Sequence, residues 1–270
     1  MADSLLANKR VLITQADVFM GPVLCDVFAR HGATVIASTD PLVHPDAPAA
    51  AVAAAGPIDI LLANLGVPAP TTPAADVTDE EWRDTFAALV DPLPRLFRAV
   101  LPAMTARRSG RILVMGSASA LRGMKRASTY SAARGAQLAY VQAVGVELAP
   151  HNVQVNAIAQ NFVDNPTYFP AEVQANPRFQ ERLKREVPLG RLVGAEEDAE
   201  FAVYLCSAPA APSPRGTTHA PRPRSGNHRR NRQSLRLAPA LNFPRKPPRN
   251  QRFRDPPLDR GNRRAQIAFQ

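Results

Sequence analysis

Cysteine, tryptophan and long apolar runs are scarce in this chain of 270 residues. The two cysteines, Cys25 and Cys206, are far apart, and we expect both to be small buried thiols in a reducing compartment rather than a disulfide or metal ligands. No stretch has the roughly 20 consecutive apolar residues needed to cross a membrane. The first ten residues lack the basic-then-apolar order of a signal peptide. The sequence therefore predicts a cytoplasmic protein with no membrane partner.

Acidic residues are almost absent from the last part of the chain. Residues 208–270 carry 14 arginines and one lysine against only Asp255 and Asp259, a net charge of +13. Residues 1–207 carry 18 basic and 21 acidic groups, a net charge of −3. Eleven prolines also fall in the last segment, which has too few apolar clusters to offset the entropy cost of ordering. We predict one folded domain at 1–207 and a basic, disordered tail at 208–270.

The predicted domain alternates apolar strands with amphipathic helices, a pattern typical of an α/β fold with a doubly wound parallel sheet of the Rossmann type. Strands are expected at residues 10–14, 34–38, 58–63, 111–115 and 153–158. Helices are expected at residues 21–31, 45–55, 78–107 with an interruption at two prolines, 129–148, 177–186 and 195–207.

Three polar residues lie close together in this pattern. Ser117 ends the fourth expected strand, and Tyr130 and Arg134 are one turn apart on the following helix. Ligands of open α/β sheets bind at the carboxyl ends of the strands. A hydroxyl, a phenol and a permanent positive charge are therefore expected to converge on one small oxygen function. The alternative is that Tyr130 and Arg134 only decorate a helix surface.

This arrangement resembles the short-chain dehydrogenase/reductase superfamily, whose signature is a Ser followed by Tyr-x-x-x-Lys. Arg134 stands in place of the Lys, and its planar guanidinium differs from a compact ammonium. Ser, Tyr and Arg form the triad of the halohydrin dehalogenases, cofactor-free relatives of those dehydrogenases. The resemblance covers about residues 8–207. It implies a lyase that converts vicinal haloalcohols to epoxides, releasing halide and a proton, and that opens epoxides with small anions in reverse.

The turn after the first strand is poor in glycine. A dinucleotide-binding relative would have Thr-Gly-x-x-x-Gly-x-Gly here, because glycines let the backbone approach the pyrophosphate. This chain keeps only Gly21; Gln15 replaces the first glycine, and Phe19 fills the space of a cofactor. We therefore expect no cofactor.

The resemblance also implies roles for individual residues. Ser117 would hold the substrate oxygen, Tyr130 would act as the base, and Arg134 would favour the phenolate. Backbone N–H groups of Phe162 and Val163 would meet the halide, and no metal is expected. The implied halide pocket consists of Phe19, Asn161, Phe162, Val163 and Tyr168. Some family members carry an Asp thought to relay protons, but this chain has Leu65 at that position.

The end of the chain departs from the superfamily pattern. A last parallel strand and a Gly-Gly turn would follow Ser207, and the sequence predicts that this strand is missing. Because the arginine-rich composition suggests GC-rich codons, we hypothesise that residues from about 208 are read in a shifted frame. The resemblance implies a homotetramer assembled through paired long helices.

Three other interpretations stay open at this point. One is a reductase that uses NAD or NADP with an atypical glycine turn, in which Asp40 would hold the adenosine ribose. Another is an inactive relative, because of the aberrant C-terminal segment. The third is a protein whose basic tail attracts nucleic acid through phosphate contacts. The tail contains no recognised nucleic-acid module, and we expect no specific nucleic-acid partner.

Overall fold

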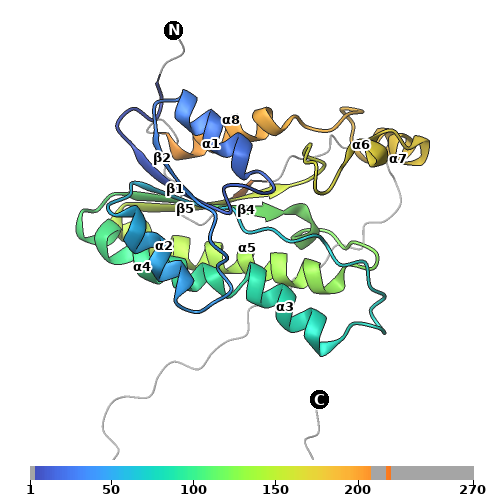
Figure 1. The fold of residues 1–270 in the computed structure, drawn as a ribbon, viewed down its shortest axis with the longest axis horizontal. Coiled ribbons are helices and arrows are strands. Elements are labelled where there is room, and N and C mark those ends of the chain that lie inside the picture. Colours follow the sequence, from blue (N-terminus) through green and yellow to red (C-terminus); the bar gives the residue numbers. More distant parts are fainter. Residues whose placement is uncertain (1–3, 208–216, 220–270) are drawn as a thin grey trace, which may run out of the picture. The chain divides into compact units, whose positions relative to one another are not determined.

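The computed structural model describes residues 4–207 and 217–219, which form a six-stranded parallel sheet between two layers of helices (Figure 1). The strand order is β2-β1-β3-β4-β5-β6. The chain runs outward from β1 to β2, then crosses back to β3 on the other side of β1 and continues in the opposite direction, so the neighbours β1 and β3 mark the switch point. This confirms the predicted doubly wound Rossmann-like sheet. The strands are β1 (Arg10–Thr14), β2 (Thr34–Ser38), β3 (Ile60–Ala63), β4 (Gly110–Ser117), β5 (Val153–Gln160) and β6 (Thr217–His219).

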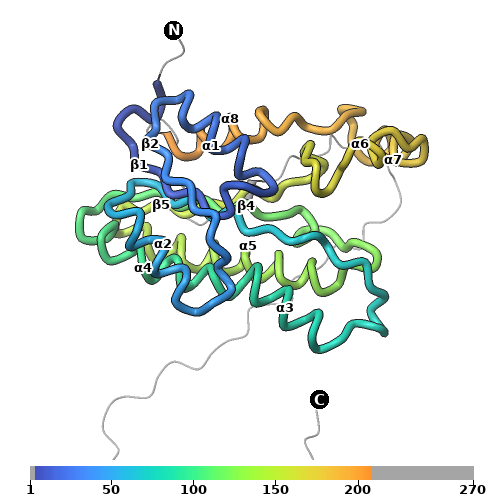
Figure 2. Tube along the Cα trace, in the orientation of Figure 1, coloured from blue at the N-terminus to red at the C-terminus, as the bar shows by residue number. Residues whose placement is uncertain are grey.

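The helices divide between the two faces of the sheet (Figures 1 and 2). On one face α1 (Gly21–Arg30) and α8 (Ala195–Cys206) pack together over a core of sheet side chains. The other face is covered by α2 (Ala47–Ala55), α3 (Asp79–Leu89), α4 (Pro92–Ala106) and α5 (Ser128–Leu148). In the described part of the chain, no helix combines the length and the hydropathy that crossing a membrane requires.

Local sequence explains where these helices begin and end. Pro22 lies in the first turn of α1, where its missing N–H costs no hydrogen bond, and Gly32 follows the helix with φ of 83°. The side chain of Thr78 accepts a hydrogen bond from the N–H of Glu81 at 3.0 Å and so caps α3. The interruption predicted within the helix 78–107 is confirmed. The helix α3 ends at Leu89, and a second helix, α4, starts at Pro92 because proline fits the first turn of a helix.

A segment between β5 and α8 carries two short helices beside the sheet edge, α6 (Ala171–Gln174) and α7 (Pro177–Glu186). The second was predicted with the same bounds. The first was not predicted, because a single turn of four residues gives no periodic apolar pattern.

The predicted absence of the last strand is wrong. Residues Thr217–His219 form β6, which pairs in parallel with β5 in the register Asn156↔Thr217, Ala157↔Thr218 and Ile158↔His219. A strand of three residues can follow a proline-rich linker without any long apolar run, which is why the sequence pattern did not reveal it. The other residues of the predicted disordered tail, 208–216 and 220–270, lie outside the described residues.

Candidate active site

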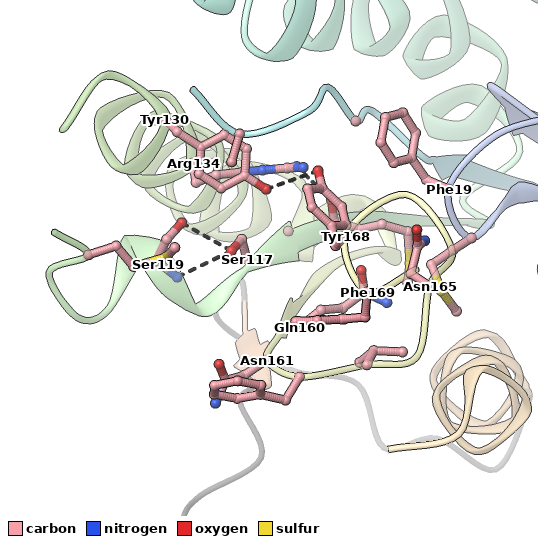
Figure 3. A pocket seen from close by; sticks show the side chains of 18 of the residues that line it. Phe19, Ser117, Ser119, Tyr130, Arg134, Gln160, Asn161, Asn165, Tyr168 and Phe169 are labelled. Atoms are coloured by element: carbon pink, nitrogen blue, oxygen red, sulfur yellow. Dashed lines mark hydrogen bonds between the residues drawn. The ribbon is translucent and has the colours of Figure 1, made fainter. Parts of the chain in front are cut away.

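All eight residues predicted for the site line one cavity of about 230 Å³. The cavity lies where β1, β3, β4 and β5 end, next to the switch between β1 and β3, as expected for an open α/β sheet. Figure 3 shows the side chains of Ser117, Tyr130, Arg134 and Tyr168 turned toward a common space. The predicted residues in the lining are Phe19, Ser117, Tyr130, Arg134, Asn161, Phe162, Val163 and Tyr168.

Ser117 ends β4, and its hydroxyl is held by Ser119 (Figure 3). The backbone N–H of Ser119 lies 3.2 Å from Ser117 Oγ, and the Ser119 hydroxyl donates to the same oxygen at 3.0 Å. Because both contacts use Ser117 Oγ as the acceptor, the proton of Ser117 stays available for a ligand oxygen. Ser119 is buried and was not predicted as a site residue.

Arg134 is buried and fixed by the ends of two strands. Its Nη1 donates to the carbonyl of Leu65 at 2.8 Å, the carbonyl of Met115 at 3.1 Å and Gln137 Oε1 at 3.0 Å. Its guanidinium carbon lies 5.0 Å from the centre of the Tyr130 ring. Burial lowers the pKa of Arg134, but the phenols of Tyr130 and Tyr168 outweigh burial and raise that pKa above its ordinary value. A permanent positive charge therefore lies beside both phenols.

Tyr168 holds the hydroxyl of Tyr130. The two hydroxyl oxygens are 3.3 Å apart, and the Tyr168 hydroxyl also donates to the carbonyl of Val67 at 2.6 Å. Burial and then the neighbouring Tyr130 raise the pKa of Tyr168 well above that of an ordinary phenol. Since Tyr168 stays protonated and donates its hydrogen bond to the carbonyl of Val67, Tyr130 is the donor within the pair of hydroxyls. Tyr168 therefore accepts a hydrogen bond from Tyr130, in addition to the predicted role of its ring in the wall of the pocket.

Two backbone N–H groups in the loop after β5 have no acceptor among the described residues. They belong to Phe162 and Val163, both buried, while the carbonyl of Phe162 and the N–H of Asp164 bond to Val193. Phe162 has φ of 54°, in the left-handed region. Buried amides without an acceptor are rare, and two adjacent ones beside a cavity suit a small anion.

The turn after β1 keeps the backbone shape of a glycine turn but not its open space. Gln15 and Phe19 stand at the first two glycine positions of the dinucleotide motif and both have positive φ, 45° and 53°. Gln15 Oε1 accepts from the N–H of Gly66 at 2.7 Å. The Phe19 ring lies over Gly66, where an added Cβ would be 2.6 Å from ring carbon Cδ2, and its centre is 5.6 Å from that of Tyr168. These side chains occupy the space of a pyrophosphate, so the residues present do not fit a nicotinamide dinucleotide.

No carboxylate lines the cavity among the described residues, and Leu65 is buried with only its carbonyl directed at Arg134. Two acids bond to lining residues: Glu186 lies 3.1 Å from Arg182 Nε, and Asp198 on α8 accepts from Gln160 Nε2 through Oδ2 at 2.5 Å. Burial raises the pKa of Asp198 to about 6, against the lowering effect of the Gln160 hydrogen bond. In the same described part of the chain, no three His, Cys, Asp or Glu side chains are grouped to hold a metal ion.

Sequence reasoning missed several residues of this site. The lining also includes Ser119, Gln160 and two further arginines, Arg122 and Arg182. The Ser-x-Ser spacing after β4 was a usable signal for Ser119, because the second hydroxyl returns to the strand end in a tight turn. Nothing in the sequence pairs Asp198 with Gln160, since they are 38 positions apart and meet only through the packing of α8.

Comparisons with known proteins point to one superfamily and two kinds of activity. A family model described as enoyl-(acyl carrier protein) reductase matches residues 24–219. A putative ketoacyl reductase of Streptomyces coelicolor is 33% identical over 173 residues, 60% of this chain and 66% of that protein. The 3-oxoacyl-(acyl carrier protein) reductase of Escherichia coli is 31% identical over 156 residues, 58% of this chain and 62% of that protein. The chain thus spans just under two thirds of the length of these relatives.

Solved structures of dehalogenases are also similar. One described as a dehalogenation enzyme is 31% identical, with a TM-score of 0.73, covering 80% of this chain and 98% of that one. A halohydrin dehalogenase bound to ethyl (2S)-oxiran-2-ylacetate is 27% identical, with a TM-score of 0.70, covering 78% and 95% of the two chains. The family match, the sheet order and the Ser117, Tyr130 and Arg134 constellation agree, and the chain belongs to the short-chain dehydrogenase/reductase superfamily.

Proposed function

We propose that this protein is a halohydrin dehalogenase, a lyase that closes a vicinal haloalcohol to an epoxide without a nucleotide cofactor. The observation that carries the proposal is that Gln15 and Phe19 fill the dinucleotide space while the Ser-Tyr-Arg cavity beside them is open. The likeness to two dehalogenase structures supports it. The same site run in reverse opens an epoxide with a small anion.

In the proposed reaction, the hydroxyl of Ser117 donates a hydrogen bond to the hydroxyl oxygen of the substrate and so orients it. The phenolate of Tyr130 takes the hydroxyl proton, and the resulting alkoxide attacks the neighbouring carbon. A carbon–oxygen bond forms as the carbon–halogen bond breaks, and halide leaves with both bonding electrons. A phenol in water loses its proton only near pH ~10. The buried cation of Arg134, with its guanidinium carbon 5.0 Å from the centre of the Tyr130 ring, favours the negative charge of the phenolate.

The departing halide is assigned to the N–H groups of Phe162 and Val163. These donors lack an acceptor within the described residues and lie at the wall of the same cavity. Apolar rings nearby exclude water, since Phe162 stacks on Phe169 at 5.9 Å and Phe19 packs against Tyr168. Fixed donors in a dry pocket stabilise a developing anion more strongly than water does.

Bromide inhibition tests this assignment. We expect bromide to inhibit conversion of a short chlorohydrin competitively, because it occupies the leaving-group site, whereas the larger sulfate at matched ionic strength does not. Inhibition by bromide that is no stronger than by sulfate would contradict the halide site.

The reductase activity named for the sequence relatives is the second candidate, supported by their 31 to 33% identity. The blocked turn after β1 argues against it. Titration with NADH and NADPH, followed by cofactor fluorescence, separates the two: saturable binding of either one would favour the reductase.

A further inference from the structure

Three guanidinium groups line the cavity, and no acid does so among the described residues. They belong to Arg122, Arg134 and Arg182. The first 207 residues carry a net charge of −3, so this positive character is local rather than a property of the whole surface. A cavity lined by charges of one sign concentrates ligands of the opposite sign.

The three arginines differ in how far their charge is already neutralised. Arg182 pairs with Glu186, with Nε 3.1 Å from Oε1. Arg134 is buried beneath Tyr130 and serves the base. Arg122 donates from Nη2 to the neutral amide oxygen of Asn161 at 2.7 Å and forms no salt bridge with any described residue. Its charge helps to lower the pKa of Glu186, but that carboxylate already forms salt bridges with Arg182 and Arg185. Of the lining arginines outside the triad, Arg122 is therefore the one that forms no salt bridge with a described residue, and the carboxylate of Glu186 that it faces is shared with two other arginines.

Arg122 is held at a defined place on the cavity wall. It follows Ser117 by five residues in the sequence. Its guanidinium carbon lies 5.5 Å from the centre of the Phe162 ring, and the guanidinium carbon of Arg182 lies 5.4 Å from the centre of the same ring. Phe162 is buried, whereas Arg122 is exposed, so the guanidinium lies where the cavity meets solvent. In Figure 3 its partner Asn161 lies apart from the group of Ser117, Tyr130 and Tyr168.

We infer that the substrates of this site are small haloalcohols and epoxides that carry a carboxylate, which Arg122 binds while Ser117 and Tyr130 hold the reacting oxygen. The inference rests on the proposed function and adds the class of substrate. Because Arg182, Arg185 and Arg122 share the carboxylate of Glu186, positive charge remains for a ligand with a single negative charge. The planar guanidinium binds a carboxylate through two parallel hydrogen bonds. The cavity volume of about 230 Å³ favours a short molecule; drug-sized ligands occupy roughly 300–1,000 Å³.

A matched pair of substrates tests this inference in the full chain. 4-Chloro-3-hydroxybutanoate and its amide have nearly the same size and differ by one charge. At low ionic strength we expect kcat/KM for chloride release to favour the acid by about tenfold, the lower end for hydrogen bonds to charged groups. Arg122→Gln should remove this preference, and Arg122→Lys should keep most of it. Lys125→Gln is the control, because Lys125 is exposed, three residues away and not in the lining.

Equal kcat/KM for acid and amide in the parent protein, or an unchanged preference in Arg122→Gln, would overturn the inference while leaving the dehalogenase proposal intact. If neither compound releases chloride, the proposed function fails instead. A binding measurement by titration calorimetry then decides the ligand class, with 3-hydroxybutanoate and 3-hydroxybutanamide as unreactive probes. Binding of the acid that weakens about tenfold in Arg122→Gln supports a carboxylate site, and equal binding of both probes refutes it.

Discussion

Hydrogen bonding at Ser117 determines whether this residue can bind a substrate oxygen. Its Oγ accepts two hydrogen bonds from Ser119, one from the backbone and one from the side chain, so its own proton is free to bind an oxygen in the cavity that Ser117 lines. Ser119 touches no reacting atom in the proposed mechanism and is therefore a positioning residue. Loss of such a side chain changes the orientation of the Ser117 hydroxyl without removing that hydroxyl.

Ser119→Ala should lower kcat/KM for a chlorohydrin by about five- to tenfold, which corresponds to loss of one hydrogen bond of about 1 kcal/mol. Ser119→Thr keeps the hydroxyl and should restore most of the activity. Steady-state kinetics measure both variants, with thermal unfolding as a check on folding. If Ser119→Ala matches the parent, or if the Thr variant is as impaired as the Ala variant, the hydroxyl does not position Ser117.

At the scale of elements, the turn after β1 and the loop after β3 interlock. Phe19 packs over Gly66 and Gln15 bonds to the same residue, so each segment holds the other in place across the sheet switch. The amide of Asn64 adds bonds to the carbonyls of Gln15 at 2.9 Å and Val18 at 3.1 Å. A glycine is needed at 66 because no side chain fits beneath the Phe19 ring.

Gly66→Ala should therefore destabilise the protein by about 1–3 kcal/mol, the usual cost of overpacking. The Phe19 ring has to move, and we expect the halide pocket it forms to bind bromide less tightly. Gly123→Ala is the matched control, since an added Cβ meets nothing within 4 Å there. Urea unfolding measures both variants. Equal stability of Gly66→Ala and Gly123→Ala would show that the two segments are not interlocked.

The sequence predicted the regular elements better than the short ones. β1 and β2 have their predicted bounds, because each is a short apolar and β-branched run that begins and ends at a polar residue. β6 was missed because a three-residue strand depends on pairing with β5 rather than on its own pattern. Within the site, motif spacing brought Ser117, Tyr130 and Arg134 together. The contacts of Arg122 with Asn161 and of Gln160 with Asp198 come only from tertiary packing.

At the scale of the whole molecule, one buried acid couples stability to pH. Burial raises the pKa of Asp198 to about 6 in the folded protein, against about 3.9 for an unfolded Asp. The folded state therefore holds this proton more tightly than the unfolded chain does. The contribution of protonated Asp198 to stability is complete below about pH 4 and is lost as pH rises through about 6.

Asp198→Asn should remove this dependence, because the amide is neutral at every pH. We expect the variant to be more stable than the parent at pH 7 by about 1–3 kcal/mol, and the difference to vanish near pH 4. Urea unfolding at several pH values measures it, with Glu196→Gln, an exposed acid on the same helix, as the control. A stability difference that does not change between pH 4 and 7 would show that Asp198 is not a buried titrating group.

Halide release without nucleotide tests the central claim most directly. Dialysed full-length protein is incubated with a short chlorohydrin, and chloride and epoxide are measured together, with folding verified by circular dichroism. We expect equal amounts of chloride and epoxide with no NADH or NADPH present, and a 10²- to 10⁴-fold lower rate in Tyr130→Phe, the usual worth of a general base. Tyr140→Phe, a phenol on the same helix outside the cavity lining, should behave like the parent. Folded protein that releases no more chloride than Tyr130→Phe would contradict the account.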